Sequence, residues 1–412
     1  MSKLPLRARL ATSIGGAAGR VSRLAGRGDG SVIGGVLGLR VEPDLLRLLA
    51  QDRQVVLVTG TNGKTTTTRL ISAALSALGQ DVATNAFGAN MEAGLASALG
   101  RAPDAPYAVL EVDERYLPAV IKATNPRLIV LLNLSRDQMD RAAEIWLTAR
   151  RWRMALAETD GCLVVANADD PLIAWAASGA PRVTWVAAGQ QWREDSWCCP
   201  ECGSHLRRDE LGWRCGECKF ARPHSRWVLS GDTVIDEGGQ VTELGLALPG
   251  RANRSNAVVA LAVGAFFGAN VGQALPRLRE VRSVAGRYTQ IAVRGRTVRL
   301  LLAKNPAGWL EAFDVLGPPP TPVLLAVNAQ VPDGKDTSWL WDVDYRVLRG
   351  RRILVAGERR LDLAVRLEAD EADFELVDGI DDAVDRVPEG ELDVIGNYTA
   401  FQQIRAVLGR TD

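Results

Sequence analysis

The sequence predicts an α/β protein in which mostly parallel strands are covered by helices on both faces. Two observations support this prediction. Short apolar runs alternate with segments of helical length, and one glycine-rich turn connects such a run directly to a helix. A polar, cysteine-bearing segment at about 190–226 interrupts the alternation once, so we interpret it as an insertion. The 412 residues, 47% of them hydrophobic, are enough for two or three domains.

The first α/β region begins with a short buried strand at Val55–Val58, followed by a glycine turn and a helix at about Thr65–Leu78. Further apolar runs predict strands at Tyr107–Val112, Leu128–Asn133 and Cys162–Ala166. After the insertion, the rhythm resumes near Gly250 with the helical pattern NAVVALAVGAFFGA at 256–269. We expect a segment at 1–45 to pack on a central domain at 46–295.

A second α/β series begins at about Arg296 and predicts a C-terminal domain at 296–412. Its candidate strands are Val298–Leu302, Val323–Val327, Ile353–Ala356 and Val394–Gly396. The proline-rich run at Pro318–Pro322 is interpreted as a loop within this domain.

The charge balance argues against a nucleic-acid partner, because Lys+Arg and Asp+Glu are equal at 49 each. The N-terminus lacks the apolar stretch of a signal peptide, so we expect a cytoplasmic protein. Its arginines and apolar residues fit either an ordinary packed or frayed segment or a basic amphipathic helix on a membrane surface. No stretch is long enough to span a bilayer, so any membrane contact would be peripheral.

A phosphate-binding loop is predicted where the first strand meets its helix. Its residues are Gly60, Thr61, Asn62, Gly63, Lys64, Thr65 and Thr66. Glycines let backbone N–H groups turn toward a polyphosphate at the helix N-terminus, Lys64 would reach the terminal phosphates, and Thr65 would bind Mg²⁺. The loop is a shortened form, because Val58 stands where the usual pattern has another glycine. The alternative is a plain glycine turn before a threonine-rich helix.

The insertion contains two C-x-x-C pairs, and this spacing allows four thiolates to bind Zn²⁺ tetrahedrally. The predicted ligands are Cys199, Cys202, Cys215 and Cys218. Four sulfur ligands leave no open position, so we expect a structural zinc ribbon. Disulfides and a redox dithiol are the alternatives. Cys198 adjoins the first pair, but its side chain is expected to point away.

Several motifs, in their order along the chain, resemble those of the Mur ligase and folylpolyglutamate synthase superfamily. They are GTNGKT at 60–65, LEVDE at 110–114, NLSRDQMDR at 133–141, ANADDP at 166–171, PGRANRSN at 249–256, GR at 286–287 and KNPAG at 304–308. The resemblance implies a Mur-ligase-type ATP-binding central domain, a Rossmann-like C-terminal domain, and ATP and Mg²⁺ as cofactors. In this family Glu111 and Thr65 would bind Mg²⁺. Asn253 and Asn256 would lie near adenine, and Arg287 would contact phosphate.

The sequence departs from the amino-acid-adding members of the superfamily. Those enzymes bind a second Mg²⁺ through a carbamylated lysine, whereas AAEIWLTARRWRMALAE at 142–158 has no lysine. Gln138 and Ala252 stand where two family histidines are expected. These departures, with KNPAGW, NYTAF at 397–401 and DGKDTSWLWDVDY at 333–345, resemble one branch, the Mur-ligase-like subunits of lipid II isoglutaminyl synthase.

That resemblance implies ATP-dependent activation of the D-glutamate α-carboxyl of the lipid II stem peptide as an acyl phosphate. Amidation to D-isoglutamine would follow, in peptidoglycan synthesis. A Mur-type or folylpolyglutamate-type ligase that adds an amino acid is the first alternative. A nucleotide-gated zinc-ribbon binding module without chemistry is the second.

The ammonia for such a reaction needs another source, because the chain has no convincing glutaminase Cys–His pair. Its two histidines, His205 and His224, lie in or beside the cysteine insertion. The resemblance implies a heterodimer with a GatD-like glutamine amidotransferase subunit that borrows an orienting acid from this chain.

Asp336 is our expected donor of that acid, ahead of Asp333, Asp342 and Asp344. A solvated acidic loop is the alternative interpretation of this segment. Together with Lys64 and Glu111, Asp336 completes the expected catalytic residues.

Overall fold

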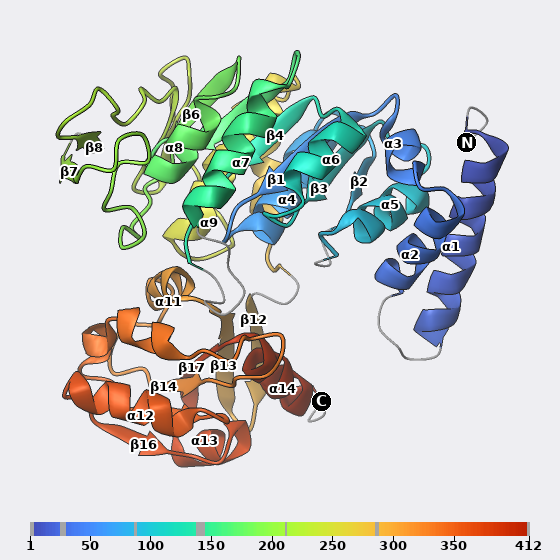
Figure 1. Cartoon of the computed structure of the whole chain (residues 1–412). Coiled ribbons are helices and arrows are strands. Elements are labelled where there is room, and N and C mark those ends of the chain that lie inside the picture. Colours follow the sequence, from blue (N-terminus) through green and yellow to red (C-terminus); the bar gives the residue numbers. More distant parts are fainter. Residues whose placement is uncertain are drawn as a thin grey trace. The chain divides into compact units, whose positions relative to one another are not determined.

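The computed structural model describes residues 4–24, 30–85, 89–136, 145–210, 212–284 and 288–409. The chain divides into two compact units (Figure 1). The first unit consists of Met1–Leu134, Glu144–Ala247 and Ala252–Val281. The second consists of Ser135–Ala143, Leu248–Arg251 and Arg282–Asp412.

A nine-stranded sheet forms the centre of the first unit, in the order β11-β10-β9-β6-β5-β4-β1-β3-β2. Neighbouring strands from β2 to β9 in this order are parallel, whereas β9, β10 and β11 are antiparallel. The strands are β1 (Gln54–Thr59), β2 (Val82–Thr84), β3 (Tyr107–Glu111), β4 (Leu128–Leu131), β5 (Leu163–Asn167), β6 (Val183–Ala187), β9 (Trp227–Ser230), β10 (Thr233–Ile235) and β11 (Val241–Glu243). The central strands are buried on both faces, as parallel strands covered by helices require.

Helices cover both faces of this sheet (Figure 1). The helices of the first unit are α1 (Leu6–Leu24), α2 (Ser31–Val41), α3 (Leu45–Ala50), α4 (Lys64–Ser76), α5 (Glu92–Arg101), α6 (Leu117–Thr124), α7 (Ile145–Ala157), α8 (Pro171–Ala177), α9 (Arg251–Phe266) and α10 (Val271–Arg279), of which α1 and α2 pack on other helices and not on the sheet. In the part of the chain that the structure describes, no helix is both long and apolar enough to cross a membrane.

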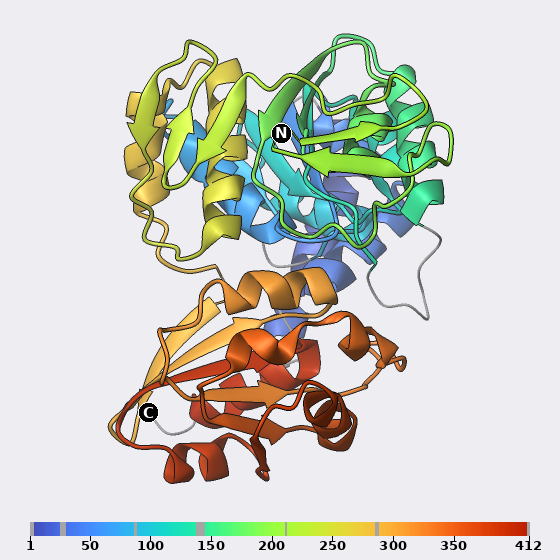
Figure 2. The same cartoon turned by 90° about the vertical axis from the view of Figure 1, so that its left-hand side faces the viewer.

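The cysteine insertion forms a two-stranded antiparallel hairpin of β7 (Leu206–Asp209) and β8 (Gly212–Cys215). Figure 2 views the first unit from the side that carries this hairpin. Tryptophan side chains tie the insertion to the sheet and to α8. The indole N–H of Trp213 donates to the carbonyl of Ala168 at 3.0 Å, and that of Trp175 donates to the carboxylate of Glu201 at 2.6 Å. The insertion is therefore docked on the body of the unit.

The second unit is built on a six-stranded sheet in the order β12-β13-β17-β14-β15-β16. Only the β12–β13 pair is antiparallel. The elements are β12 (Tyr288–Val293), β13 (Arg296–Leu302), α11 (Pro306–Phe313), β14 (Val323–Ala326), η1 (Ser338–Asp342), η2 (Tyr345–Leu348), β15 (Ile353–Ala356), α12 (Arg360–Ala369), β16 (Phe374–Leu376), α13 (Ile380–Arg386), β17 (Gly390–Gly396) and α14 (Tyr398–Leu408). A parallel sheet with helical crossovers confirms the predicted α/β class.

The predicted strands that carry the fold are confirmed in both units, and most of them begin and end within two residues of the expected positions. The largest difference among them is at β17, which starts at Gly390 and not at Val394. The antiparallel extension β9–β11 and the edge strand β12 were not predicted. These strands are short and most of their residues are exposed or half-buried, so they carry little of the pattern that marks a buried strand.

Candidate active site and metal centre

The loop from Gly60 to Gly63 connects the carboxyl end of β1 to the N-terminus of α4, between the ends of β3 and β4. This is the position at which parallel α/β sheets bind ligands. Gly60 and Gly63 have φ values of 138° and 84°, which other residues adopt only with strain. A Cβ on Gly63 would lie 2.9 Å from the side-chain oxygen of Asn256. Both conformation and space therefore require glycine at this position.

Lys64 is buried, and its ammonium group is held by groups of the loop itself. The Nζ donates to the carbonyl oxygens of Gly60 and Thr61 at 2.5 and 3.2 Å. It also forms an ion pair with Glu114 at 3.1 Å. The indole of Trp152 in turn donates to the carbonyl of Glu114 at 2.9 Å. The positive charge of Lys64 thus lies against the loop, beside the N-terminus of α4, which favours anions.

Glu111 ends β3, and its carboxylate accepts a hydrogen bond from the Thr65 hydroxyl at 2.7 Å. Both side chains are buried. The buried amide of Asn85 braces the end of β3, because it accepts from the Glu111 N–H and donates to the Glu111 carbonyl, each at 2.8 Å. A hydroxyl and a carboxylate are oxygen donors of the kind that Mg²⁺ prefers, so this pair fits the ion.

Asn133 holds the phosphate loop from the segment after β4. Its side-chain oxygen accepts from the Asn62 N–H at 2.9 Å, and its amide donates to the Asn62 carbonyl at 3.0 Å. The Asn133 carbonyl also accepts from the Thr61 N–H at 2.9 Å. These three bonds fix the turn of the loop, and they use neither of the two carbonyl groups that bind Lys64.

Asn253 and Asn256 lie in the first turns of α9, as the motif predicts. The structure brings Asn256 next to Gly63, so α9 borders the phosphate loop. Ser255, between them, donates to the carbonyl of Ala188 after β6. Arg287, the expected phosphate contact, lies outside the described residues, and so does Gln138.

The ANADDP turn after β5 is an organising element of the first unit. Asp170 caps α8 and accepts from the N–H groups of Leu134, Leu172 and Ile173. Burial nevertheless raises the pKa of Asp170, against the lowering effect of these bonds. The neighbouring Asp169 forms an ion pair with Arg222 of the insertion at 2.7 Å. The turn therefore joins the sheet, α8 and the cysteine insertion.

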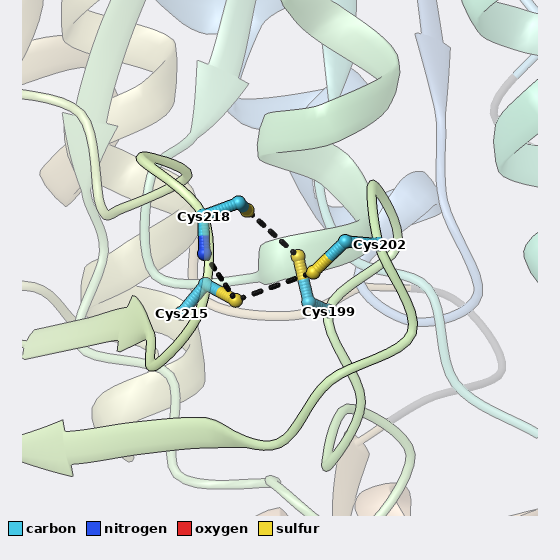
Figure 3. A group of neighbouring side chains, drawn as sticks. All are labelled: Cys199, Cys202, Cys215 and Cys218. Carbon is cyan, nitrogen blue, oxygen red and sulfur yellow. Dashed lines mark hydrogen bonds between the residues drawn. The ribbon is translucent and has the colours of Figure 1, made fainter.

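The four predicted zinc ligands come together at the open end of the β7–β8 hairpin (Figure 3). The Sγ atoms of Cys199 and Cys218 are 3.7 Å apart, and those of Cys202 and Cys215 are 3.5 Å apart. Tetrahedral zinc with Zn–S distances of about 2.3 Å places sulfurs about 3.8 Å apart, whereas a disulfide joins them at about 2.0 Å. All four atoms lie within 4.8 Å of one another, so the cluster fits one ion.

The surroundings of one sulfur, that of Cys215, favour the thiolate that a metal binds, whereas burial raises the pKa of the Cys199 thiol to about 12. The backbone N–H groups of Glu217 and Cys218 donate to the Cys215 sulfur at 3.4 Å, and they lower the pKa of this thiol to about 6. Such N–H···S bonds stabilise thiolate, the form that binds metal. Cys198 is exposed and lies outside the cluster, as predicted.

Four acidic residues of the second unit were candidates to complete a partner's active site, and three of them are engaged within the unit. Asp333 is buried and accepts from the Thr399 N–H at 2.9 Å. Asp344 pairs with Arg346, and Asp342 pairs with Arg136. Among the described residues, Asp336 bonds to Ser338, and these bonds lower the pKa of its carboxyl.

Comparison with known proteins gives two family matches along the chain. The Mur ligase middle domain matches residues 58–264, and the MurT ligase C-terminal domain matches residues 302–401. The lipid II isoglutaminyl synthase (glutamine-hydrolyzing) subunit MurT of Streptococcus pneumoniae is 32% identical over 391 residues, which cover 87% of each chain. The chain belongs to the Mur ligase family, among the MurT subunits. The MurT subunit of Staphylococcus aureus strain COL is 30% identical with the same coverage.

Solved structures show the same fold. A pseudomurein peptide ligase type C from Methanothermus fervidus superimposes with a TM-score of 0.68 and 20% identity, over 90% of this chain and 81% of that chain. A folylpolyglutamate synthase from Mycobacterium tuberculosis, complexed with ADP, superimposes with a TM-score of 0.61 and 18% identity, over 89% and 93%. The chain therefore has a Mur-ligase-like α/β fold, and its family consists of ATP-dependent ligases that form amide bonds.

Sequence reasoning did not identify two residues that the structure places at the loop. Glu114, the partner of Lys64, lies three residues after Glu111 in the LEVDE motif, so its position in that motif was an available signal. Asn85 follows the short strand β2, and nothing in its local sequence points to the end of β3.

Proposed function

We propose that the chain uses ATP to activate the D-glutamate α-carboxyl of the lipid II stem peptide and that ammonia then converts it to D-isoglutamine. The MurT relatives are named for this synthase activity. The observation that carries the proposal is the loop itself, where the Lys64 ammonium and the Thr65–Glu111 oxygen pair stand at one helix N-terminus. This arrangement suits the transfer of a terminal phosphate.

In the proposed reaction, a carboxylate oxygen of the substrate attacks the γ-phosphorus of ATP, and ADP leaves. Lys64 exchanges its bonds to the Gly60 and Thr61 carbonyls for phosphate oxygens and neutralises the charge that develops there. Thr65 and Glu111 would hold Mg²⁺, which supplies further charge neutralisation on the phosphates. Loop N–H groups and α4 orient the γ-phosphate for in-line attack.

In the second step, ammonia attacks the carbonyl carbon of the acyl phosphate, phosphate leaves and one proton is released. Substrate labelled with ¹⁸O in the carboxylate would test this route, because one labelled oxygen should appear in the inorganic phosphate. Label retained entirely in the substrate and product would exclude an acyl phosphate.

We further propose that ammonia comes from a glutaminase partner of the GatD type in a heterodimer. Asp336 would orient the partner's catalytic histidine. Its low pKa keeps the carboxylate ionised at neutral pH. Within the described residues it pairs with no arginine, whereas Asp342 pairs with Arg136 and Asp344 with Arg346. Asp333 is buried against Thr399, so it is unsuited to contact another chain.

Replacement of Asp336 by Asn tests this role. We expect glutamine-dependent amidation to fall by about 100-fold or more, because the partner's histidine loses its orienting charge. Activity with ammonium chloride should remain. Asp344→Asn is the matched control and should leave both activities unchanged. Equal loss of both activities in the Asp336 variant would show that the residue acts elsewhere.

An amino-acid-adding ligase remains the rival reaction. The lysine that such enzymes use is absent from the described helix α7, Ile145–Ala157, which counts against this reaction. ATP turnover with lipid II that requires an amino acid and not ammonia would favour the rival. A binding module without chemistry would show no substrate-dependent ATP turnover at all.

We propose that the four-cysteine cluster holds one structural Zn²⁺. Cys199→Ser should lower zinc content from one equivalent toward none and loosen the hairpin, because the apolar cluster that joins the insertion to α8 is small and includes two of the cysteine ligands. Cys198→Ser is the matched control, since Cys198 is exposed beside the cluster. Unchanged zinc content in Cys199→Ser would contradict the assignment.

A further inference from the structure

Helix α1 turns its small residues toward the protein and its large apolar residues toward solvent. Ala8 and Ala11 are fully buried, and Gly15 and Gly19 are buried with them. The opposite face carries an exposed apolar stripe, which we define as Leu6, Leu10, Val21 and Leu24, exposed by 82%, 56%, 65% and 89%. A surface helix that only packs on its own domain has the reverse pattern.

The stripe lies along one side of the helix in two pairs, separated by a stretch that includes exposed Ser13 and Ala17. With about 100° of rotation per residue, its four side chains lie within about 60° of one another. Ile14, also exposed, lies at its edge, and helix α2 adds exposed Val32 and Val36. Figure 1 shows α1 as an outer element of the first unit, packed against α2.

Close backbone packing prevents α1 from turning this stripe inward. A Cβ on Gly15 would lie 2.5 Å from the Gly34 carbonyl oxygen of α2, and one on Gly34 would lie 2.5 Å from the Gly15 oxygen. Rotation of α1 about its axis would place larger side chains between the backbones of α1 and α2, where there is no room for a Cβ atom. On its other side, α2 packs equally closely through Gly35 against Ala93 of α5. The stripe is therefore held on the surface by the fold.

The charge around the stripe is positive. The segment from Leu4 to Leu24 has four arginines and no acidic residue, although the whole chain has equal numbers of each charge. Arg9 and Arg20 are exposed, and the helical periodicity places both along one border of the stripe. Arg7 is engaged instead with the Val41 carbonyl and with Glu42. A second copy of α1 would bring arginines against arginines, whereas anionic lipid headgroups would complement them.

We propose that the stripe of α1, with Arg9 and Arg20, docks on the surface of a membrane that contains anionic lipids. The helix would lie in the interface, with the apolar side chains among the upper acyl chains and the guanidinium groups at the phosphates. This inference rests on the geometry and charge of α1 and does not depend on the proposed reaction.

Co-sedimentation of the full chain with vesicles tests the proposal. The chain should bind vesicles of phosphatidylcholine mixed with phosphatidylglycerol about tenfold or more tightly than phosphatidylcholine alone, and salt should weaken this binding. Leu10→Glu with Val21→Glu should reduce binding by about tenfold or more, because two apolar side chains no longer enter the interface. Arg9→Gln with Arg20→Gln should reduce binding to the anionic vesicles alone.

Val241→Glu with Leu361→Glu is the matched control, because these side chains are similarly exposed, at 61% and 65%, on other elements. Its vesicle binding should equal that of the wild type, and ATP binding should be unchanged in every variant. A wild-type chain that stays in the supernatant with anionic vesicles would overturn the proposal. So would a Leu10→Glu, Val21→Glu variant that still sediments fully, or one that only converts a dimer to a monomer in light scattering.

Discussion

The two units carry polar side chains at the same place, the carboxyl ends of parallel strands, but they use them differently. After β1 in the first unit, Lys64 is held by two backbone carbonyls and by Glu114. After β14 in the second unit, Asn328 donates to Thr399 and Gln403 and accepts from the Glu358 N–H. The first set of contacts can be exchanged for phosphate oxygens, whereas the second is a closed amide network.

The contrast shows why strand position alone does not identify a binding site. Lys64 and Asn328 are both buried and hydrogen-bonded, so burial does not distinguish them. What differs is the surrounding backbone. The loop after β1 has glycines with positive φ and leads directly into the N-terminus of a 13-residue helix, and these features prepare it for an anion. The Asn328 network is instead closed by Asn397, whose amide donates to the Asn328 carbonyl at 2.7 Å.

The largest expected effect is at Lys64. Lys64→Ala should lower ATP-dependent product formation by about 1000-fold, because charge developing on the phosphate loses its main neutralising group. Lys122→Ala is the matched control, since Lys122 is an exposed lysine on α6. Initial rates with ammonium as the nitrogen source are the measurement. Activity near the wild-type level would mean that Lys64 does not neutralise phosphate charge, and the contrast with the network after β14 would fail.

A smaller effect is expected at the closed network, and it should fall on stability. Asn328→Ala removes the partner of the buried Thr399 hydroxyl and of the more exposed Glu358 N–H and Gln403 side chain, which should cost about 1 to 3 kcal/mol. Urea unfolding should show an earlier transition, while ATP binding by the folded chain is retained. An unchanged transition would indicate that the network is not closed in solution.

The smallest effect is expected at Asn133, the asparagine that braces the phosphate loop. Asn133→Ala removes two bonds to the Asn62 backbone, which is exposed enough for water to replace them. The KM for ATP should rise by about tenfold, with little change in the unfolding transition. Together with Asn328→Ala, this variant separates an asparagine that positions a loop from one that stabilises a sheet. A stability loss equal to that of Asn328→Ala would remove the distinction.

The sequence was sufficient for the features that depend on local pattern. The segment from Gln54 to Ser76 could be predicted as a strand, a glycine loop and a helix, because few other structures share its apolar periodicity and glycine spacing. The four-cysteine site could also be predicted from the sequence, because tetrahedral metal binding constrains the spacing of the ligands.

Features that depend on distant partners were not predictable. The pairing of Lys64 with Glu114 joins residues 50 positions apart, and Asn85 reaches Glu111 across 26. The outward stripe of α1 also required the structure, since the sequence pattern of apolar residues fits an inward face equally well. The burial of Ala8 and Ala11 and the glycine contacts between α1 and α2 show which face is buried.

Mass spectrometry of lipid II incubated with this chain, ATP, Mg²⁺ and ammonium chloride tests the central claim most directly, with Lys64→Ala as the inactive reference. We predict conversion of one stem-peptide carboxyl to an amide, a decrease of about one mass unit, only when ATP is present and only with intact Lys64. An unchanged mass, from protein shown to bind ATP and supplied also with glutamine and the proposed GatD-type glutaminase, would contradict this prediction.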